Sequence, residues 1–265
     1  MTSNAPALFQ SVAATGRDWL ANVIALAYPP LCALTREPIP KGDLSDRAKE
    51  QLLKYASENR CWRCASAVGP HLETKPNGCD LCRDTSFAFT RVLRLSLYED
   101  ELAAACRRMK HVSGHRLAVA LGNLLAESLG DELRRLGVDY VVPVPLHWRT
   151  EWQRRYNPSL ALAERIARFL ERPLIPRAVL RSRRTLPQHH LSMTERRTNV
   201  RNAFQKGQDR RVFGARILLV DDVMTTGATC HESARALKDA GAAEIFVVVL
   251  ARGGPRRDHA PPPIP

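Results

Sequence analysis

The sequence predicts an α/β fold, in which helices cover both faces of a parallel sheet, preceded by a small four-cysteine module. Two observations lead to this prediction. From residue 87 onward, apolar β-branched runs alternate with helical runs, which is typical of a parallel sheet. Residues 61–84 instead hold paired cysteines and turn-forming residues with almost no aliphatic side chains, so this segment needs a cross-link or a metal to fold. The expected organisation is an N-terminal arm with a short helix at 1–31, the cysteine module at 32–86, the α/β domain at 87–252 and a disordered tail at 253–265.

The N-terminal arm is polar at first and becomes apolar from Trp19. Pro29 and Pro30 interrupt the apolar run, so we expect a short docking helix here rather than a membrane anchor. No stretch approaches the roughly 20 apolar residues that a membrane span needs, and no secretory signal is evident. We therefore expect a cytoplasmic protein without a membrane span. The charged stretch that follows, at 41–60, can form one amphipathic helix.

Two Cys-x2-Cys pairs, separated by fourteen residues, are the clearest metal-binding signal. Without a secretory signal, a disulfide framework is disfavoured. Two thiolate pairs on tight turns suit a structural, tetrahedral Zn²⁺ site, whose binding energy would fold the segment. Four reduced cysteines without a metal are the alternative, and His71 between the pairs could replace one of them. The predicted Zn²⁺ ligands are Cys61, Cys64, Cys79 and Cys82.

The chain from residue 87 alternates expected strands and helices. Apolar and polar residues alternate in the first strand, as in a half-buried strand, whereas the later strands are short apolar runs. The helical segments repeat apolar residues at 3.6-residue spacing. The expected strands are Val92–Tyr98, Tyr140–Val144, Ile217–Val220 and Ile245–Leu250, and the expected helices are Leu117–Leu136, Pro158–Leu170 and Thr229–Ala240.

The most informative segment follows the apolar strand that ends at Val220. Asp221 and Asp222 come first, and a turn of small and hydroxylated residues then leads into a helix. Open α/β folds bind ligands where their strands end, and backbone N–H groups at a helix N-terminus bind phosphate. Paired carboxylates repel phosphate but accept hydrogen bonds from ribose hydroxyls. We therefore predict that the two carboxylates hold the sugar of a ribose 5-phosphate group, although a polar turn without a ligand is the alternative. The predicted phosphate-binding residues are Thr225, Thr226, Gly227, Ala228 and Thr229.

The thirteen residues from Ile217 to Thr229 resemble the phosphoribosyl pyrophosphate signature of type I phosphoribosyltransferases. Residues 142–157 resemble the pyrophosphate loop of these enzymes, and residues 181–204 resemble their flexible loop and the strand after it. With the cysteine pairs, these segments resemble the ComF/GntX family of competence-type phosphoribosyltransferase-like proteins over roughly residues 24–252. The resemblance implies a Rossmann-like parallel sheet of the type I phosphoribosyltransferase fold, preceded by a zinc-ribbon-like module.

The resemblance also implies roles for arginines in these segments. Arg149, Arg154 and Arg155 would neutralise pyrophosphate, and Arg183 or Arg184 would close over the site. A solvated basic face is the alternative for each of them, since long charged side chains lie on surfaces by default.

The first functional hypothesis is a Mg²⁺-dependent phosphoribosyltransferase. It would displace pyrophosphate from phosphoribosyl pyrophosphate through an oxocarbenium-like transition state and transfer the phosphoribosyl group to an unknown acceptor. Asp221 and Asp222 are the predicted catalytic residues because they would hold the sugar. Mg²⁺ would bridge ribose hydroxyls and pyrophosphate, and the basic loops would stabilise charge on the leaving group.

The net charge of +13 and the excess of Arg over Lys leave a second hypothesis open. Because Arg matches phosphate geometry, the chain could be a nucleic-acid-binding module for DNA uptake that performs no turnover, with single-stranded nucleic acid or DNA-uptake proteins as partners. A GC-rich genome explains the Arg excess equally well, and an aromatic content of 6% provides few rings for base stacking. A ligand-sensing or scaffolding role is the third hypothesis.

Overall fold

The computed structural model describes residues 29–69, 76–183, 185 and 193–254. His71, Arg184, most of the predicted arm and most of the predicted tail lie outside the described residues. The chain divides into two compact units, residues 1–49 and 50–265. None of the helices within the described ranges has both the length and the apolar character that crossing a membrane requires.

In the first unit, residues 29–45 form a tight loop around Cys32. An antiparallel bridge joins Leu31 to Pro38. The Cys32 Sγ accepts hydrogen bonds from the backbone N–H groups of Thr35, at 3.5 Å, and Ser45, at 3.4 Å. Helix α2 (Asp46–Leu53) follows this loop, so the helix expected within 41–60 is limited to eight residues.

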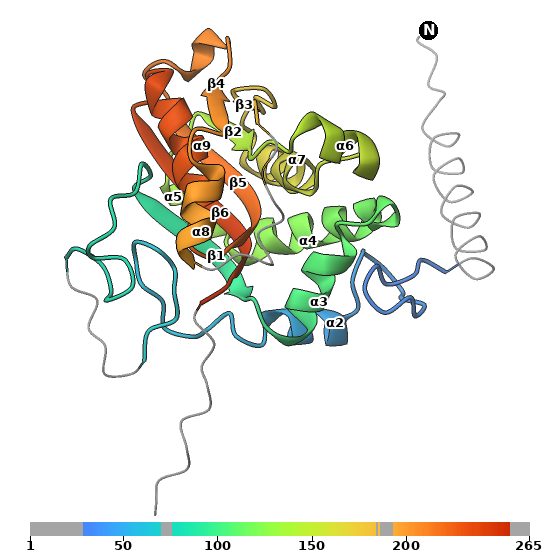
Figure 1. The fold of residues 1–265 in the computed structure, drawn as a ribbon. Helices are drawn as coiled ribbons and strands as arrows, with labels where there is room; N and C mark the ends of the chain where they lie inside the picture. Colours follow the sequence, from blue (N-terminus) through green and yellow to red (C-terminus); the bar gives the residue numbers. More distant parts are fainter. Residues whose placement is uncertain (1–28, 70–75, 184, 186–192, 255–265) are drawn as a thin grey trace, which may run out of the picture. The chain divides into compact units, whose positions relative to one another are not determined.

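The second unit contains a parallel four-stranded sheet in the order β1-β6-β5-β2 (Figure 1). Each neighbouring pair is parallel, which confirms the predicted sheet. A separate antiparallel pair is formed by two short strands, β3 and β4. The strands are β1 (Arg91–Leu97), β2 (Tyr140–Pro143), β3 (Val179–Arg181), β4 (Phe204–Lys206), β5 (Arg216–Met224) and β6 (Glu244–Arg252).

Helices cover both faces of the sheet (Figure 1). On one face, Ile217 and Leu219 of β5 share a core cluster with Cys230 and Leu237 of α9. The opposite face packs against α7, which in turn contacts α4. The remaining helices are α3 (Asp100–Arg108), α4 (His115–Ser128), α5 (Gly130–Arg135), α6 (Trp148–Arg154), α7 (Pro158–Leu170), α8 (Met193–Val200) and α9 (Ala228–Asp239).

Helix α7 has the bounds that the sequence predicts. The Asn157 side chain caps its N-terminus by accepting a hydrogen bond from the N–H of Ser159 at 3.0 Å, and Pro158 occupies the first helical position. The same Asn157 donates from Nδ2 to the carbonyl of Val144 at 3.0 Å. The cap therefore also fixes α7 to the segment that leaves β2.

Strand β1 is buried along almost its whole length, so the prediction of a half-buried strand was wrong. Its polar residues Arg94 and Ser96 are buried. The Arg94 guanidinium donates to the carbonyl oxygens of Ala65, at 2.8 Å, and Glu58, at 3.2 Å. Backbone carbonyls that precede the sheet therefore accept two hydrogen bonds from the buried guanidinium of Arg94.

Candidate functional site

The turn between β5 and α9 depends on Gly227, which has a left-handed backbone conformation with a φ of 78°. A Cβ at this position would lie 2.6 Å from Met224 Cε and 3.2 Å from Phe87 Cε1. The Thr226 hydroxyl accepts a hydrogen bond from the N–H of Ala228, the first residue of α9, at 3.3 Å. The predicted phosphate-binding residues therefore occupy a tight turn and the first two positions of a twelve-residue helix.

Strand β5 extends four residues beyond its predicted end, so both acidic residues belong to the strand itself. Asp221 is buried, and its Oδ1 accepts hydrogen bonds from Ser159 Oγ at 3.0 Å and from the backbone N–H of Asp222 at 2.9 Å. Burial, followed by the charge of Asp222, raises the pKa of Asp221 to about 7. The Asp221 carboxyl thus joins β5 to α7.

Asp222 is only partly buried and has a cationic partner. Its Oδ2 lies 2.7 Å from the Lys110 Nζ, and its Oδ1 accepts a hydrogen bond from the N–H of Val223 at 2.8 Å. The negative charge of Asp222 is the main cause that raises the pKa of Lys110. Lys110, which follows α3, is a site residue that the sequence did not indicate.

The Tyr156 hydroxyl is a second unforeseen feature of this region. It is buried, and it has no hydrogen-bond partner among the residues that the structure describes. Burial, and to a smaller extent the charge of Asp222, raises the pKa of Tyr156 to about 12, whereas the charge of Arg154 opposes this rise. A buried hydroxyl without a partner carries a desolvation cost that a ligand can remove.

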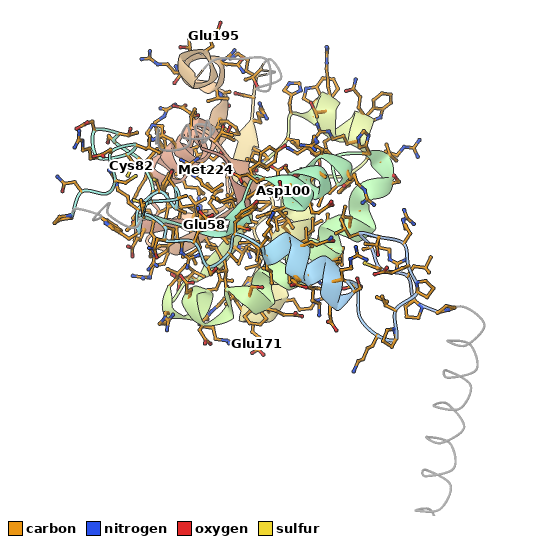
Figure 2. The ribbon with its side chains drawn as sticks, turned by 90° about the horizontal axis from the view of Figure 1, so that it is seen from below. Glu58, Cys82, Asp100, Glu171, Glu195 and Met224 are labelled. Atoms are coloured by element: carbon orange, nitrogen blue, oxygen red, sulfur yellow. The ribbon has the colours of Figure 1, made fainter. Side chains whose placement is uncertain are left out.

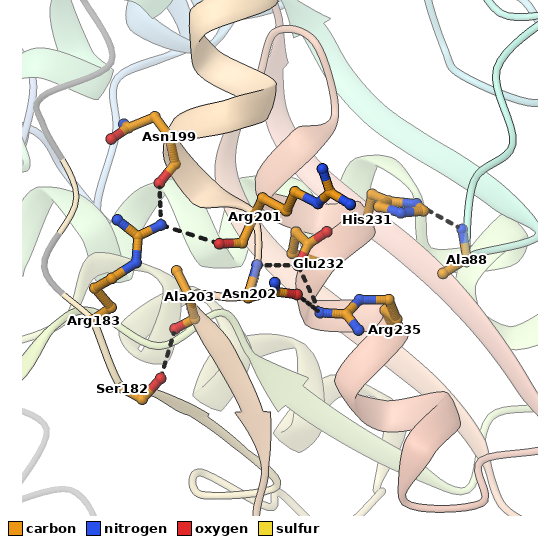
Figure 3. Close-up of polar contacts among 10 residues, drawn as sticks. All are labelled: Ala88, Ser182, Arg183, Asn199, Arg201, Asn202, Ala203, His231, Glu232 and Arg235. Atoms are coloured by element: carbon orange, nitrogen blue, oxygen red, sulfur yellow. Dashed lines mark hydrogen bonds and ion pairs between the residues drawn. The ribbon is translucent and has the colours of Figure 1, made fainter.

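A cavity of about 370 Å³ lies beside the turn. Thr226, at the turn, and His231, on α9, line it together with Arg201. Figure 3 shows the Arg201 side chain extending toward His231, whose Nδ1 accepts a hydrogen bond from the N–H of Ala88 at 3.1 Å. Arg201 therefore brings a positive charge to the same cavity as the N-terminal turn of α9, where a phosphate group is favoured.

The segment that carries Arg201 is held by side chains on both sides (Figure 3). Arg183 donates to the carbonyl oxygens of Asn199, at 2.9 Å, and Arg201, at 3.0 Å. The Glu232 carboxylate of α9 accepts a hydrogen bond from the N–H of Asn202 at 2.9 Å. Arg183 thus braces the backbone next to the cavity, and Arg184, its predicted companion, lies outside the described residues.

The other predicted arginines lie on or just after α6, a helix in which none of the seven residues is buried. The Arg149 guanidinium carbon lies 5.0 Å from the centre of the Trp148 ring. Arg155 follows the helix with a φ of 62° and lines a hollow of about 750 Å³ together with Trp148 and Trp152. These two tryptophans are 64% and 80% exposed, so α6 presents aromatic and basic groups together.

The four predicted metal ligands form one buried cluster, with Sγ atoms all within 4.8 Å of one another. Three of the six Sγ–Sγ distances are 3.7 Å for Cys61–Cys82, 3.7 Å for Cys64–Cys79 and 3.8 Å for Cys79–Cys82. Gly78 precedes the second pair, and a Cβ there would lie 2.4 Å from Cys82 Sγ. This group of thiols can hold one metal ion.

Three comparisons relate the chain to known proteins. Residues 157–261 match the phosphoribosyl transferase domain family. DNA utilization protein YhgH of Escherichia coli O157:H7 is 31% identical over 231 residues, which are 86% of this chain and 99% of that protein. Competence protein F of Haemophilus influenzae is 29% identical over 218 residues, which are 81% of this chain and 92% of that protein.

Two solved structures show weaker likeness. The glutamine phosphoribosylpyrophosphate amidotransferase of B. subtilis, complexed with ADP and GMP, is 22% identical with a TM-score of 0.35, over 54% of this chain and 30% of its own. A purine phosphoribosyltransferase from Pyrococcus horikoshii is 19% identical with a TM-score of 0.31, over 53% of this chain and 90% of its own.

The family match, the parallel sheet and the cysteine cluster confirm the predicted fold class, a type I phosphoribosyltransferase fold with a four-cysteine group. The relatives match this chain over nearly their full lengths. The chain therefore belongs to the ComF/GntX family of phosphoribosyltransferase-like proteins.

Proposed function

We propose that this chain binds phosphoribosyl pyrophosphate with Mg²⁺ and transfers the phosphoribosyl group to an acceptor. The observation that carries this proposal is the Gly227 turn, which joins the end of β5, where Asp222 lies, to the N-terminus of α9. The N–H groups of the turn suit the 5-phosphate, and Arg201 in the neighbouring cavity adds positive charge. The match to the phosphoribosyl transferase domain family supports this function.

The sugar end of the ligand fits Asp222 better than Asp221. Asp221 is already engaged with Ser159 and is buried, so we propose that it fixes the end of β5. The Asp222 carboxylate is partly exposed and, in the proposed complex, accepts hydrogen bonds from ribose hydroxyls. The Tyr156 hydroxyl, which lacks a partner among the described residues, then gains one from the ligand.

The residues present fit a divalent cation at the same place. Asp222 provides the carboxylate oxygen that Mg²⁺ prefers, and this carboxylate already pairs with the ammonium group of Lys110. Mg²⁺ supplies charge neutralisation for the pyrophosphate leaving group. Arg154 and Arg155 would assist from the α6 side, as the family resemblance implies.

Binding and turnover can be tested separately with the full chain. We expect calorimetric titration with phosphoribosyl pyrophosphate and Mg²⁺ to detect binding, and a panel of nucleobase acceptors to reveal acceptor-dependent release of pyrophosphate. Asp222→Asn should weaken binding at least about tenfold, because it removes a charged hydrogen-bond acceptor. Asp131→Asn, on α5, makes the same charge change at an exposed site and serves as the control. The absence of heat with any phosphorylated pentose, or equal losses in both variants, would contradict the proposal.

We also propose that the cysteine cluster binds Zn²⁺ as a structural ion. A tetrahedral Zn²⁺ with Zn–S bonds of about 2.3 Å has sulfur–sulfur edges of about 3.8 Å. Three of the six Sγ–Sγ distances, at 3.7, 3.7 and 3.8 Å, agree with this geometry, and all six lie within 4.8 Å. Zn²⁺ would fold the segment around the cysteines, and metal analysis of the purified chain tests this directly.

Exposed aromatic residues on α6 favour a second candidate function, the binding of single-stranded nucleic acid in DNA utilization. Trp148 and Trp152 lie four residues apart on one exposed helix, so they share a face, and Arg149 lies over the Trp148 ring. Exposed rings with neighbouring arginines are the features that stack and attract single strands. The names of the two relatives, DNA utilization protein and competence protein, agree with this role.

This candidate makes a distinct prediction for binding to a labelled single-stranded oligonucleotide, measured by fluorescence anisotropy. Replacing both Trp148 and Trp152 with Ala should weaken binding at least about tenfold, because stacking contributes about 1–3 kcal/mol per base. Phe213→Ala removes a ring that is 79% exposed elsewhere on the chain and should leave affinity unchanged. Equal affinity of the wild type and the double variant, or a weak dependence on salt, would argue against nucleic-acid binding on α6.

A further inference from the structure

A buried arginine, Arg252, connects the cysteine cluster to the turn that follows β5. It is the last residue of β6 and is 6% exposed. Its Nε donates to the carbonyl oxygen of Cys64 at 2.9 Å. Its Nη1 donates to the carbonyl oxygen of Met224 at 3.1 Å and also to that of Thr225. Residues 225–227, between β5 and α9, are called the phosphate turn after their proposed ligand. One planar guanidinium thus joins the backbone of the first cysteine pair to Thr225, the first residue of the phosphate turn.

A second connection runs from the other cysteine pair through Phe87. Arg63 donates to the carbonyl oxygen of Cys82 at 2.8 Å, and its guanidinium carbon lies 5.4 Å from the centre of the Phe87 ring. The Phe87 ring packs against the buried cysteines and lies 3.2 Å from the point where a Cβ on Gly227 would be. Figure 2 labels Met224 and Cys82, which mark the two regions that these contacts join. Both cysteine pairs are therefore connected to the phosphate turn, the first through Arg252 and the second through Arg63 and Phe87.

These contacts connect the backbone position of the phosphate turn to the backbone position of the cysteine cluster. The guanidinium of Arg252 is rigid and planar, so its donors fix the carbonyls of Cys64, Met224 and Thr225 relative to one another. The cysteine turns have few apolar contacts of their own, and a bound metal would supply the cross-link that holds the Cys64 carbonyl in place. If this carbonyl moves, the buried charge of Arg252 loses one of its acceptors, and the turn loses part of its support.

We propose that Arg252 is a positioning residue through which the metal-loaded cysteine turns hold the phosphate turn in its binding conformation. The affinity of the chain for a ribose phosphate then depends on a metal site that does not touch the ligand. This inference rests on the proposed function of the turn and adds to it a structural reason for the presence of the cysteine cluster.

Arg94 offers a matched control in the same part of the molecule. It is also a buried arginine on a strand of the sheet, and it also donates to the backbone of the first cysteine turn, at Ala65. The same guanidinium also donates to the carbonyl of Glu58, which is not part of the phosphate turn. Arg94→Met therefore removes a comparable buried anchor of the cysteine segment but spares the direct connection that Arg252 makes.

The test uses the full chain loaded with Zn²⁺ and compares the wild type with Arg252→Met, Arg252→Lys and Arg94→Met. Calorimetry gives the affinity for ribose 5-phosphate, metal analysis gives the Zn²⁺ content, and hydrogen exchange without ligand reports on the backbone of residues 223–230, with α7 as the internal reference. We expect Arg252→Met to keep its Zn²⁺, to exchange faster in the turn and to bind at least about tenfold more weakly, because a buried charged donor is lost. Arg252→Lys should recover part of the affinity, and Arg94→Met should match the wild type in both readouts.

Metal removal provides the complementary test. Chelating Zn²⁺ from the wild type should speed exchange in the turn but not in α7. Wild-type exchange and affinity in Arg252→Met, or equal effects in Arg94→Met, would overturn the inference. Suppose that the wild type fails to bind ribose 5-phosphate while hydrogen exchange in the turn still changes with Arg252 substitution and with Zn²⁺ removal. In that case the proposed function is wrong, but the structural connection between the metal site and the turn is supported.

Discussion

Replacing Gly227 with Ala tests whether the phosphate turn needs the conformation that the structure gives it. Its φ of 78° lies in the left-handed region, which costs an L-residue about 1–2 kcal/mol relative to glycine. The new Cβ would also lie 2.6 Å from Met224 Cε and 3.2 Å from Phe87 Cε1. Shifting these side chains adds about 1–3 kcal/mol. We therefore expect Gly227→Ala to lower the free energy of unfolding by about 2–5 kcal/mol, measured by urea denaturation.

Gly214 separates the two contributions, because it has a φ of 71° and no heavy atom within 4 Å of its potential Cβ. Gly214→Ala should therefore lower the free energy of unfolding by the backbone cost alone, about 1–2 kcal/mol. Only Gly227→Ala should also weaken binding of ribose 5-phosphate. If the two variants are equally stable, the crowding of the turn by Met224 and Phe87 does not exist in solution, and the reasoning is refuted.

Three further predictions concern other groups of the site. Folding raises the pKa of Asp221 from 3.8 to about 7. Between these pH values the folded chain binds a proton that the unfolded chain has lost. The contribution of Asp221 to stability therefore decreases as pH rises from about 4 to 7. Asp221→Asn should remove that component from urea denaturation measured across this pH range, and an unchanged pH dependence would contradict it. Tyr156→Phe should leave the unfolding free energy unchanged or raise it, because the hydroxyl has no partner among the described residues, yet it should weaken phosphoribosyl pyrophosphate binding about fivefold or more; unchanged affinity in calorimetry would exclude Tyr156 from the ligand site. Cys79→Ser should abolish metal binding in elemental analysis, whereas Cys106→Ser, at a buried thiol outside the cluster, should retain it; metal retained by both variants would show that the cluster is not the metal site.

Local signals explain why much of the fold could be predicted. The bounds of α7 follow from the Asn157 cap and Pro158, both of which act within one turn of the helix. Likewise, a Gly between small hydroxylated residues indicates a turn before α9, and the structure has one at Gly227. The spacing of the cysteine pairs predicted their cluster because each pair needs only a short turn to bring its two thiols together.

The rest depends on contacts between residues far apart in the sequence. Arg94 looks like an outward-facing residue of an alternating strand, but it is buried, and its guanidinium donates to the carbonyls of Glu58 and Ala65. Lys110 follows an ordinary amphipathic helix, and only the fold brings it to Asp222. The roles assigned to Arg149 and Arg155 came from the family resemblance, and both remain predictions, as do the domain boundaries.

The ion pair between Lys110 and Asp222 has a consequence for ligand selection. A neutral sugar that approaches Asp222 must compete with an ammonium group already 2.7 Å from the carboxylate. A ligand that arrives with its own divalent cation restores the lost positive charge at the carboxylate, and its phosphate groups can receive the displaced lysine. We therefore expect this ion pair to discriminate, at the proposed ligand site, against uncharged pentoses and in favour of metal-bound, phosphorylated ones.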